Sequence, residues 1–155
     1  MFKKKSIIGI VLVGIIALVV GLGSMSLADT SDENSRSTLP EDEEWMLVAL
    51  GDKDNPQDVL DGTEITITFV KDKVTSSIGF SGSAGCNHYF GSFETTPEGL
   101  AVGPIGATEM WCGDEGVMDQ ESQFLKALGM VDEYQIDGDT LEMLYSGGAL
   151  IFAAC

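Results

Sequence analysis

Short apolar runs alternate with turn signals through most of the chain after residue 44, and this pattern predicts a mainly β fold. Ile65, Ile67 and Phe69 alternate with threonines, as in a strand that buries one face. The polar stretch 51–62 is typical of a loop. We expect strands over residues 45–50, 65–69, 74–82, 87–94, 100–105, 107–111, 133–136, 140–145 and 149–154.

The period changes after residue 115, where the spacing predicts one amphipathic helix over residues 116–128. Val117, Met118, Phe124, Leu125 and Leu128 are assigned to its apolar face. Acidic residues lie early in this segment, a lysine lies late, and a glycine follows the last apolar position. These signals fit the two ends of a single helix.

The number and order of these elements favour a closed or nearly closed antiparallel barrel of about eight short strands with one helix. The first strand, 45–50, and the last strand, 149–154, are both apolar. Pairing between them would remove two exposed sheet edges. We therefore expect the first and last strands to be neighbours in the sheet.

The first 28 residues have the pattern of an export signal. Three lysines at positions 3–5 precede an uncharged, mostly apolar run, and Ser26 and Ala28 fit a cleavage site after Ala28. The run is also long enough to remain as a membrane anchor. Both alternatives place the rest of the chain outside the cytoplasm, because the lysines stay inside. No cysteine stands near the cleavage site, which argues against a lipid anchor.

Residues 29–44 are dense in serine, threonine, aspartate and glutamate, and they predict a disordered acidic linker. Such a segment has too little apolar surface to offset the entropy of ordering. The folded domain is accordingly expected over residues 45–155.

The charge balance narrows the range of partners. The chain of 155 residues carries a formal net charge of −17, from 25 acidic and 8 basic residues. A surface of this sign repels nucleic acid and anionic lipid headgroups. Nucleic-acid binding is therefore not expected, and the only membrane contact expected is through the N-terminal segment if it is uncleaved.

A compact motif lies between residues 82 and 112. Its residues are Gly82, Gly85, Asn87, Tyr89, Gly91, Thr108 and Met110, together with Cys86 and Cys112. Through this motif the chain resembles the META/HslJ domain family. The resemblance extends from Trp45 to residue 154. It implies a lipocalin-like barrel with one helix, an envelope location in many members, and a stress association in some. It supplies no catalytic residue and no cofactor.

Three cysteines allow three disulfide pairings. Oxidising surroundings outside the cytoplasm favour a disulfide. We favour Cys86–Cys112, because both belong to the motif and Cys155 is the last residue. The alternative is that Cys86 and Cys112 are reduced thiols packed in the interior.

Cys86 and His88 also suggest a nucleophile beside a base, or part of a metal site with Cys112. A disulfide would abolish the nucleophile, and a structural zinc site requires four ligands. The aspartates between residues 52 and 61 suggest calcium but do not follow the EF-hand pattern. We therefore expect no catalytic residue, no metal and no cofactor.

One ligand site remains as a hypothesis. Phe90, Phe93 and Trp111 are the candidates for lining an apolar pocket at the barrel mouth. The favoured function is a non-enzymatic extracytoplasmic domain that binds an envelope protein or a small apolar ligand. The alternatives are a structural accessory module of an envelope complex and a thiol-dependent enzyme using Cys86. A packed barrel interior would argue against an internal ligand.

Overall fold

The computed structural model describes residues 39–73, 75, 77–96 and 99–155. The predicted export segment 1–28 and most of the predicted linker lie outside the described residues. Within the described residues, no helix has the length and apolar character needed to cross a membrane.

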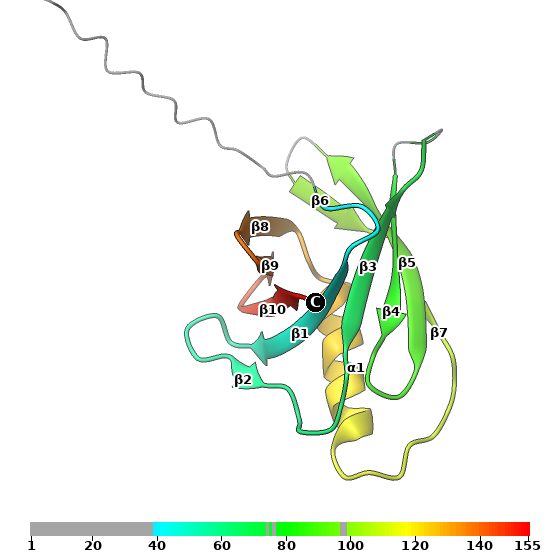
Figure 1. Cartoon of the computed structure of the whole chain (residues 1–155), viewed down its shortest axis with the longest axis vertical. Helices are drawn as coiled ribbons and strands as arrows, with labels where there is room; N and C mark the ends of the chain where they lie inside the picture. The colour runs from blue at the N-terminus through cyan, green and yellow to red at the C-terminus, as the bar shows by residue number, and fades with distance from the viewer. Residues whose placement is uncertain (1–38, 74, 76, 97–98) are drawn as a thin grey trace, which may run out of the picture. The chain divides into compact units, whose positions relative to one another are not determined.

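The described residues form ten strands and one helix (Figure 1). The strands are β1 (Glu44–Gly51), β2 (Gln57–Asp58), β3 (Thr66–Lys71), β4 (Ile78–Ser83), β5 (His88–Thr96), β6 (Gly99–Val102), β7 (Gly106–Ala107), β8 (Glu133–Asp137), β9 (Thr140–Tyr145) and β10 (Gly148–Ala154). The helix is α1 (Val117–Leu128), close to its predicted range.

Eight of these strands follow one another in a single antiparallel sheet. Their order is β6-β5-β4-β3-β1-β10-β9-β8, while β2 pairs with β1 and β7 pairs with β5 off this path. Trp45 lies opposite Ala154 and Leu50 lies opposite Leu150, so the predicted pairing of the first and last strands is confirmed. Because β1 pairs with β10, the first and last strands of the folded domain are neighbours.

The sheet curls until its two outer strands, β6 and β8, approach each other. The backbone N–H of Leu100 donates to the carbonyl oxygen of Asp132 over 2.8 Å. At Gly99 an added Cβ would lie 2.3 Å from the same oxygen. The sheet is thus nearly closed, which confirms the predicted antiparallel barrel with one helix.

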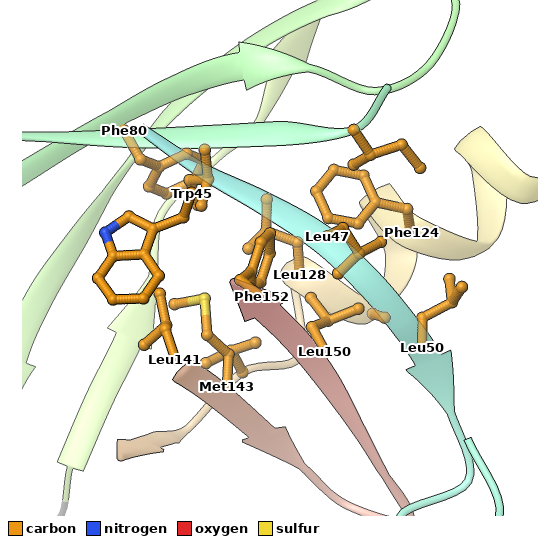
Figure 2. Close-up of a cluster of buried hydrophobic side chains, with 14 of the residues drawn as sticks. Trp45, Leu47, Leu50, Phe80, Phe124, Leu128, Leu141, Met143, Leu150 and Phe152 are labelled. Atoms are coloured by element: carbon orange, nitrogen blue, oxygen red, sulfur yellow. The ribbon is translucent and has the colours of Figure 1, made fainter. Parts of the chain in front are cut away.

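The helix supplies part of the core. Phe124 packs edge-to-face against Tyr89 of β5 and Phe152 of β10, with ring centroids 5.3 and 6.4 Å apart. It therefore joins two strands that are far apart in the sheet order. Figure 2 shows Phe124 and Leu128 among buried side chains from β1, β9 and β10.

The centre of the barrel is filled by large apolar side chains. The largest fully buried ones are Trp45, Tyr89, Phe69, Phe93, Phe124, Phe152, Ile65, Ile67, Leu128, Leu141, Met143 and Leu150. Among the described residues, Trp45 Nε1 is buried without a hydrogen-bond partner, so Trp45 stabilises the core through apolar packing alone.

The domain begins before the predicted boundary at Trp45. Leu39 is 3 % exposed and belongs to the core, and the N–H of Asp42 donates to the carbonyl of Phe69 over 3.0 Å. Composition places residues 39–44 in the acidic linker, because Leu39 is their only large apolar residue. The buried Leu39 side chain and the hydrogen bond to Phe69 together hold the segment against the barrel.

Three other differences have local causes. Strand β4 begins at Ile78, because the Asp72 carboxylate accepts from the N–H of Thr75 and holds a turn before it. The predicted loop 51–62 contains β2, which pairs with β1 at Ala49 and Leu50. The predicted strand 107–111 is reduced to β7, because the backbone N–H and C=O of Met110 bond to the Asn87 side chain instead of to a strand.

Gly82 lies so close to the backbone of β3 that there is no room for a side chain. A Cβ added at Gly82 would lie 1.9 Å from the carbonyl oxygen of Thr66. The Tyr89 hydroxyl donates to that same oxygen over 2.7 Å. The hydrogen bond from Tyr89 holds this carbonyl in place, so only glycine fits at position 82.

We predict that Gly82→Ala destabilises the domain by about 3 kcal/mol, because the new methyl group overlaps a fixed carbonyl. The free energy of unfolding, measured by urea denaturation of the full chain, checks this value. The matched control is Gly79→Ala in the same strand, where an added Cβ meets Val70 O at 3.4 Å. Equal stability of the two variants would contradict the conclusion that only glycine fits at position 82.

Candidate functional site

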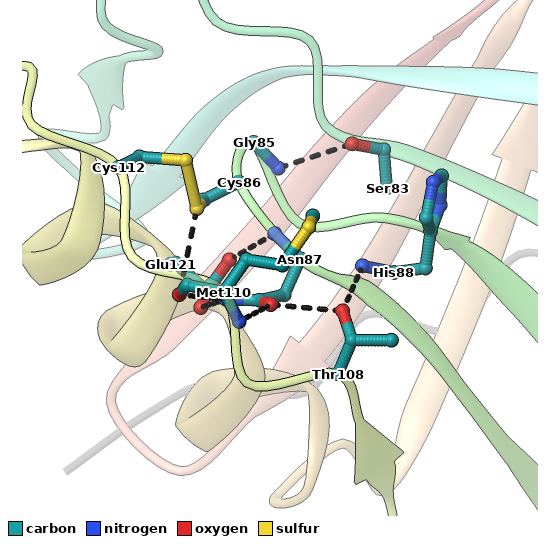
Figure 3. The surroundings of a disulfide bond; sticks show 9 residues. All are labelled: Ser83, Gly85, Cys86, Asn87, His88, Thr108, Met110, Cys112 and Glu121. Atoms are coloured by element: carbon teal, nitrogen blue, oxygen red, sulfur yellow. Dashed lines mark hydrogen bonds between the residues drawn. A yellow bond between two sulfur atoms is a disulfide. The ribbon is translucent and has the colours of Figure 1, made fainter.

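Two segments of the motif lie side by side at one end of the barrel (Figure 3). The turn after β4 carries Gly85, Cys86 and Asn87, and the segment after β7 carries Thr108 to Cys112. Helix α1 reaches the same place through Glu121. The motif thus gathers three regions that are separate in sequence.

Cys86 and Cys112 form a disulfide, with their Cα atoms 6.0 Å apart. The favoured pairing is therefore confirmed. Cys155 is free and exposed. Desolvation, with the nearby carboxylates of Glu44 and Glu64, raises the pKa of the Cys155 thiol, which keeps it protonated at neutral pH.

Asn87 is the most fully engaged polar residue of the motif. Asn87 is only 2 % exposed. Nδ2 donates to Glu121 Oε1 over 2.7 Å and to the Met110 carbonyl over 3.2 Å. Oδ1 accepts from Thr108 Oγ1 over 2.8 Å and from the Met110 N–H over 2.7 Å. Both donors and the acceptor are satisfied, so the amide holds structure together.

Glu121 is a buried carboxylate, 6 % exposed, that receives two hydrogen bonds from one residue. Its Oε2 accepts from the Asn87 backbone N–H over 2.6 Å, and its Oε1 accepts from Asn87 Nδ2. Bonds to an ionised acceptor are stronger than neutral ones. These two bonds compensate for the loss of hydration at the carboxylate.

Gln120 holds a second loop against the helix. Its Oε1 accepts from the Leu60 N–H over 2.7 Å, and its Nε2 donates to Thr63 Oγ1 over 2.9 Å. The loop before β3 is thereby fixed to α1. Together, Gln120 and Glu121 place two polar anchors in the first half of the helix.

Sequence reasoning missed both anchors. The buried helix positions are Val117, Gln120, Glu121, Phe124, Ala127 and Leu128. Their spacing of three and four is the signal that could have found them, because it continues the apolar stripe through two polar residues. Met118 and Leu125, assigned to the buried face, are instead only half-buried.

The remaining motif residues also have packing roles. Gly85 adopts a φ of +100°, and an added Cβ at Gly91 would lie 2.4 Å from the Phe80 ring. Tyr89 is buried, and burial raises the pKa of its hydroxyl well above the ordinary value. The hydroxyl therefore remains a hydrogen-bond donor to Thr66.

The three candidate pocket residues are not brought together. Phe93 is fully buried and packs on Phe80, with ring centroids 4.5 Å apart. Phe90 is 64 % exposed on the other face of β5, and Trp111 is 83 % exposed. The prediction of an apolar pocket lined by these residues is therefore wrong. Strand alternation separates Phe90 from Phe93, since odd positions of β5 face inward.

The side chains that suggested catalysis or calcium binding include His88 and Asp52, and both are exposed. His88 is exposed, and its backbone N–H donates to Thr108 Oγ1 over 3.1 Å. The Asp52 carboxylate accepts from the N–H groups of Asp54 and Asn55, which makes it a loop cap. Within the described residues, no group of three or more His, Cys, Asp or Glu side chains could hold a metal ion.

We predict that Asn87→Asp costs about 3 kcal/mol of stability, because a second carboxylate would face Glu121 in a buried site. Adding Glu121→Gln to that variant should recover much of the loss, since the new amide can donate to Asp at position 87. The free energies of unfolding of the single and double variants measure the coupling. A double variant no more stable than Asn87→Asp would show that repulsion from Glu121 does not cause the loss of stability.

We predict that Cys86→Ser with Cys112→Ser lowers the free energy of unfolding by about 3 kcal/mol, because the unfolded chain regains the conformational entropy that the disulfide-closed loop removes. The control is Cys155→Ser, which should leave the unfolding midpoint unchanged, because this thiol is exposed and unpaired. Mass measurement after thiol alkylation, without reductant, should find one alkylated cysteine in the unmodified chain. Three alkylated cysteines would contradict the disulfide.

Comparison with known proteins places this fold among solved structures. A protein from Burkholderia xenovorans, solved by NMR, matches with 26% identity and a TM-score of 0.61, over 78% of this chain and 86% of that one. A second NMR structure matches with 17% identity and a TM-score of 0.50, over 72% and 87%. A DUF4847 family protein from Bacteroides vulgatus, solved by crystallography, matches with 16% identity and a TM-score of 0.45, over 72% and 91%.

No curated protein matches the chain. The family model of the META domain matches residues 37–154, which includes Leu39 and the segment before Trp45. The match thus starts near where the described barrel starts. The chain belongs to the META domain family.

Proposed function

We propose that this chain is a non-enzymatic extracytoplasmic domain that binds a protein partner through its outer surface. The observation that carries the proposal is the filled barrel. Trp45, Phe69, Phe93, Phe124 and Phe152 occupy the interior, where related architectures hold ligands when hollow. This favours a protein at the surface over the small apolar ligand that was considered with it.

The state of the motif supports the non-enzymatic part of the proposal. The Cys86 sulfur is joined to Cys112, and a disulfide sulfur is not a thiolate nucleophile. Asn87 and Glu121 satisfy each other in the interior. The groups that first suggest chemistry are therefore used to hold the turn, the segment after β7 and the helix together.

The sequence supports the extracytoplasmic part. A basic start followed by an apolar run is the pattern of an export signal or anchor. A disulfide persists in oxidising compartments and is rare in the cytosol. The negative net charge of −17 keeps such a domain soluble and away from anionic headgroups.

Chemical cross-linking in intact cells tests location and partner together. We predict that a membrane-impermeant, amine-reactive cross-linker joins the folded domain to another protein, giving one or a few adducts of defined mass. The reactive groups are Lys53, Lys71, Lys73 and Lys126, which the sequence places in the domain. Mass spectrometry of the adducts identifies the partner.

The control is a cytoplasmic protein of the same cells, which must stay unmodified until lysis. Modification of the folded domain only after lysis would contradict the outside location. Modification in intact cells without any protein adduct would contradict the binding part of the proposal.

A further inference from the structure

In the described part of the chain, strand β8 has an outer edge that is unpaired along most of its length. Strand β8 ends the sheet path and pairs only with β9 among the described residues. The bond from the Leu100 N–H reaches Asp132, the residue before β8. Beyond that bond, residues 133–137 pair with no second strand within the described part of the chain. We call this stretch the β8 edge.

The hairpin between β8 and β9 fixes which backbone groups the β8 edge presents. Asp137 pairs with Thr140 across a two-residue turn, and Gly138 has the positive φ of +56° that such a turn requires. Residues 137, 135 and 133 therefore exchange hydrogen bonds with β9. In an antiparallel pair these positions alternate, so the N–H and C=O groups of Tyr134 and Ile136 point outward along the edge.

The side chains of β8 alternate in the same way. Tyr134 and Ile136 are half-buried and pack against the core, while Glu133, Gln135 and Asp137 are exposed. A strand added to this edge places its own residues opposite these ones, with side chains on the same faces. Residues opposite Tyr134 and Ile136 would face apolar surface. The alternate residues would lie beside Glu133, Gln135 and Asp137 on the solvent face.

The surface beside the β8 edge is acidic. Two clefts border it, of about 290 and 370 Å³. Their linings include the carboxylates of Asp132, Glu133, Asp137 and Glu142, and no lysine or arginine among the described residues. A second copy of this chain would bring acid against acid, which is how natural edges resist self-pairing. The charge favours a basic occupant.

We propose that the β8 edge binds an extended peptide segment in which basic and apolar residues alternate, by antiparallel strand addition. The inference rests on the proposed function and names the surface and the partner class. The apolar residues of the peptide lie opposite Tyr134 and Ile136 and exchange backbone hydrogen bonds with them. The basic residues lie opposite Glu133, Gln135 and Asp137 on the solvent face.

The test uses the full chain in a neutral detergent and a fluorescent octapeptide of alternating lysine and valine. Fluorescence anisotropy at physiological salt measures its dissociation constant. Two further peptides carry N-methyl groups, one on its valines and one on its lysines. Methylation of the valines removes the N–H groups that face the β8 edge, so binding should weaken more than about tenfold. Methylation of the lysines removes only outward N–H groups, so affinity should stay within about twofold.

A charge reversal in the protein supplies the second arm. Glu133→Lys should weaken binding of the lysine–valine peptide about tenfold, because it places a like charge on the edge. The matched control is Asp54→Lys, which makes the same charge change in the exposed loop after β1 and should leave affinity unchanged. Circular dichroism confirms that both variants retain the fold.

Equal binding of the two methylated peptides would overturn the proposal, because it would show electrostatic adsorption without strand pairing. Equal effects of Glu133→Lys and Asp54→Lys would overturn it in the same way. A dimer in sedimentation velocity that the lysine–valine peptide disperses would assign the edge to a second copy. Any of these results, with a partner still cross-linked in intact cells, would leave the proposed function standing.

Discussion

The hydrogen bonds between Asn87 and Glu121 determine how this end of the barrel is built. One carboxylate accepts both the backbone N–H and the side-chain Nδ2 of Asn87, over 2.6 and 2.7 Å. Asn87 then has Oδ1 and its other Nδ2 hydrogen available for Met110. Because the Met110 backbone is engaged by a side chain, the segment after β7 cannot continue as a strand. The chain turns there and brings Cys112 to Cys86.

Two kinds of constraint therefore act on the same contact. The Asn87 bonds stabilise the native state directly, because leaving a buried polar group without a hydrogen bond costs about 1–3 kcal/mol. The disulfide acts mainly by restricting the unfolded chain across 26 positions. Their effects should add rather than replace each other, since one depends on native geometry and the other on unfolded entropy. The hydrogen bonds select the position, and the covalent bond keeps it.

Local periodicity predicted most of the fold, and the misses share a physical cause. The barrel was predictable from two features: the alternation of Ile65, Ile67 and Phe69 with polar residues, and the apolar character of the first and last strands. Glu121 was invisible because a charged helix residue is normally solvated, and only the register with Phe124 reveals its burial. Phe93 was misassigned although strand parity with Tyr89 places it inward. Leu39 was missed because a single apolar side chain in an acidic segment gives no periodic signal.

The motif that identifies the family thus holds the turn after β4, the segment after β7 and the helix together, and the proposed partner site lies elsewhere on the surface. The β8 edge shows how one feature can serve two purposes. Its carboxylates at Glu133 and Asp137 repel an identical edge, which limits self-association. The same carboxylates attract basic chains. The whole domain is acidic, however, so charge alone cannot select one site over another. Selection then depends on the outward backbone groups of Tyr134 and Ile136, which only an extended strand can satisfy.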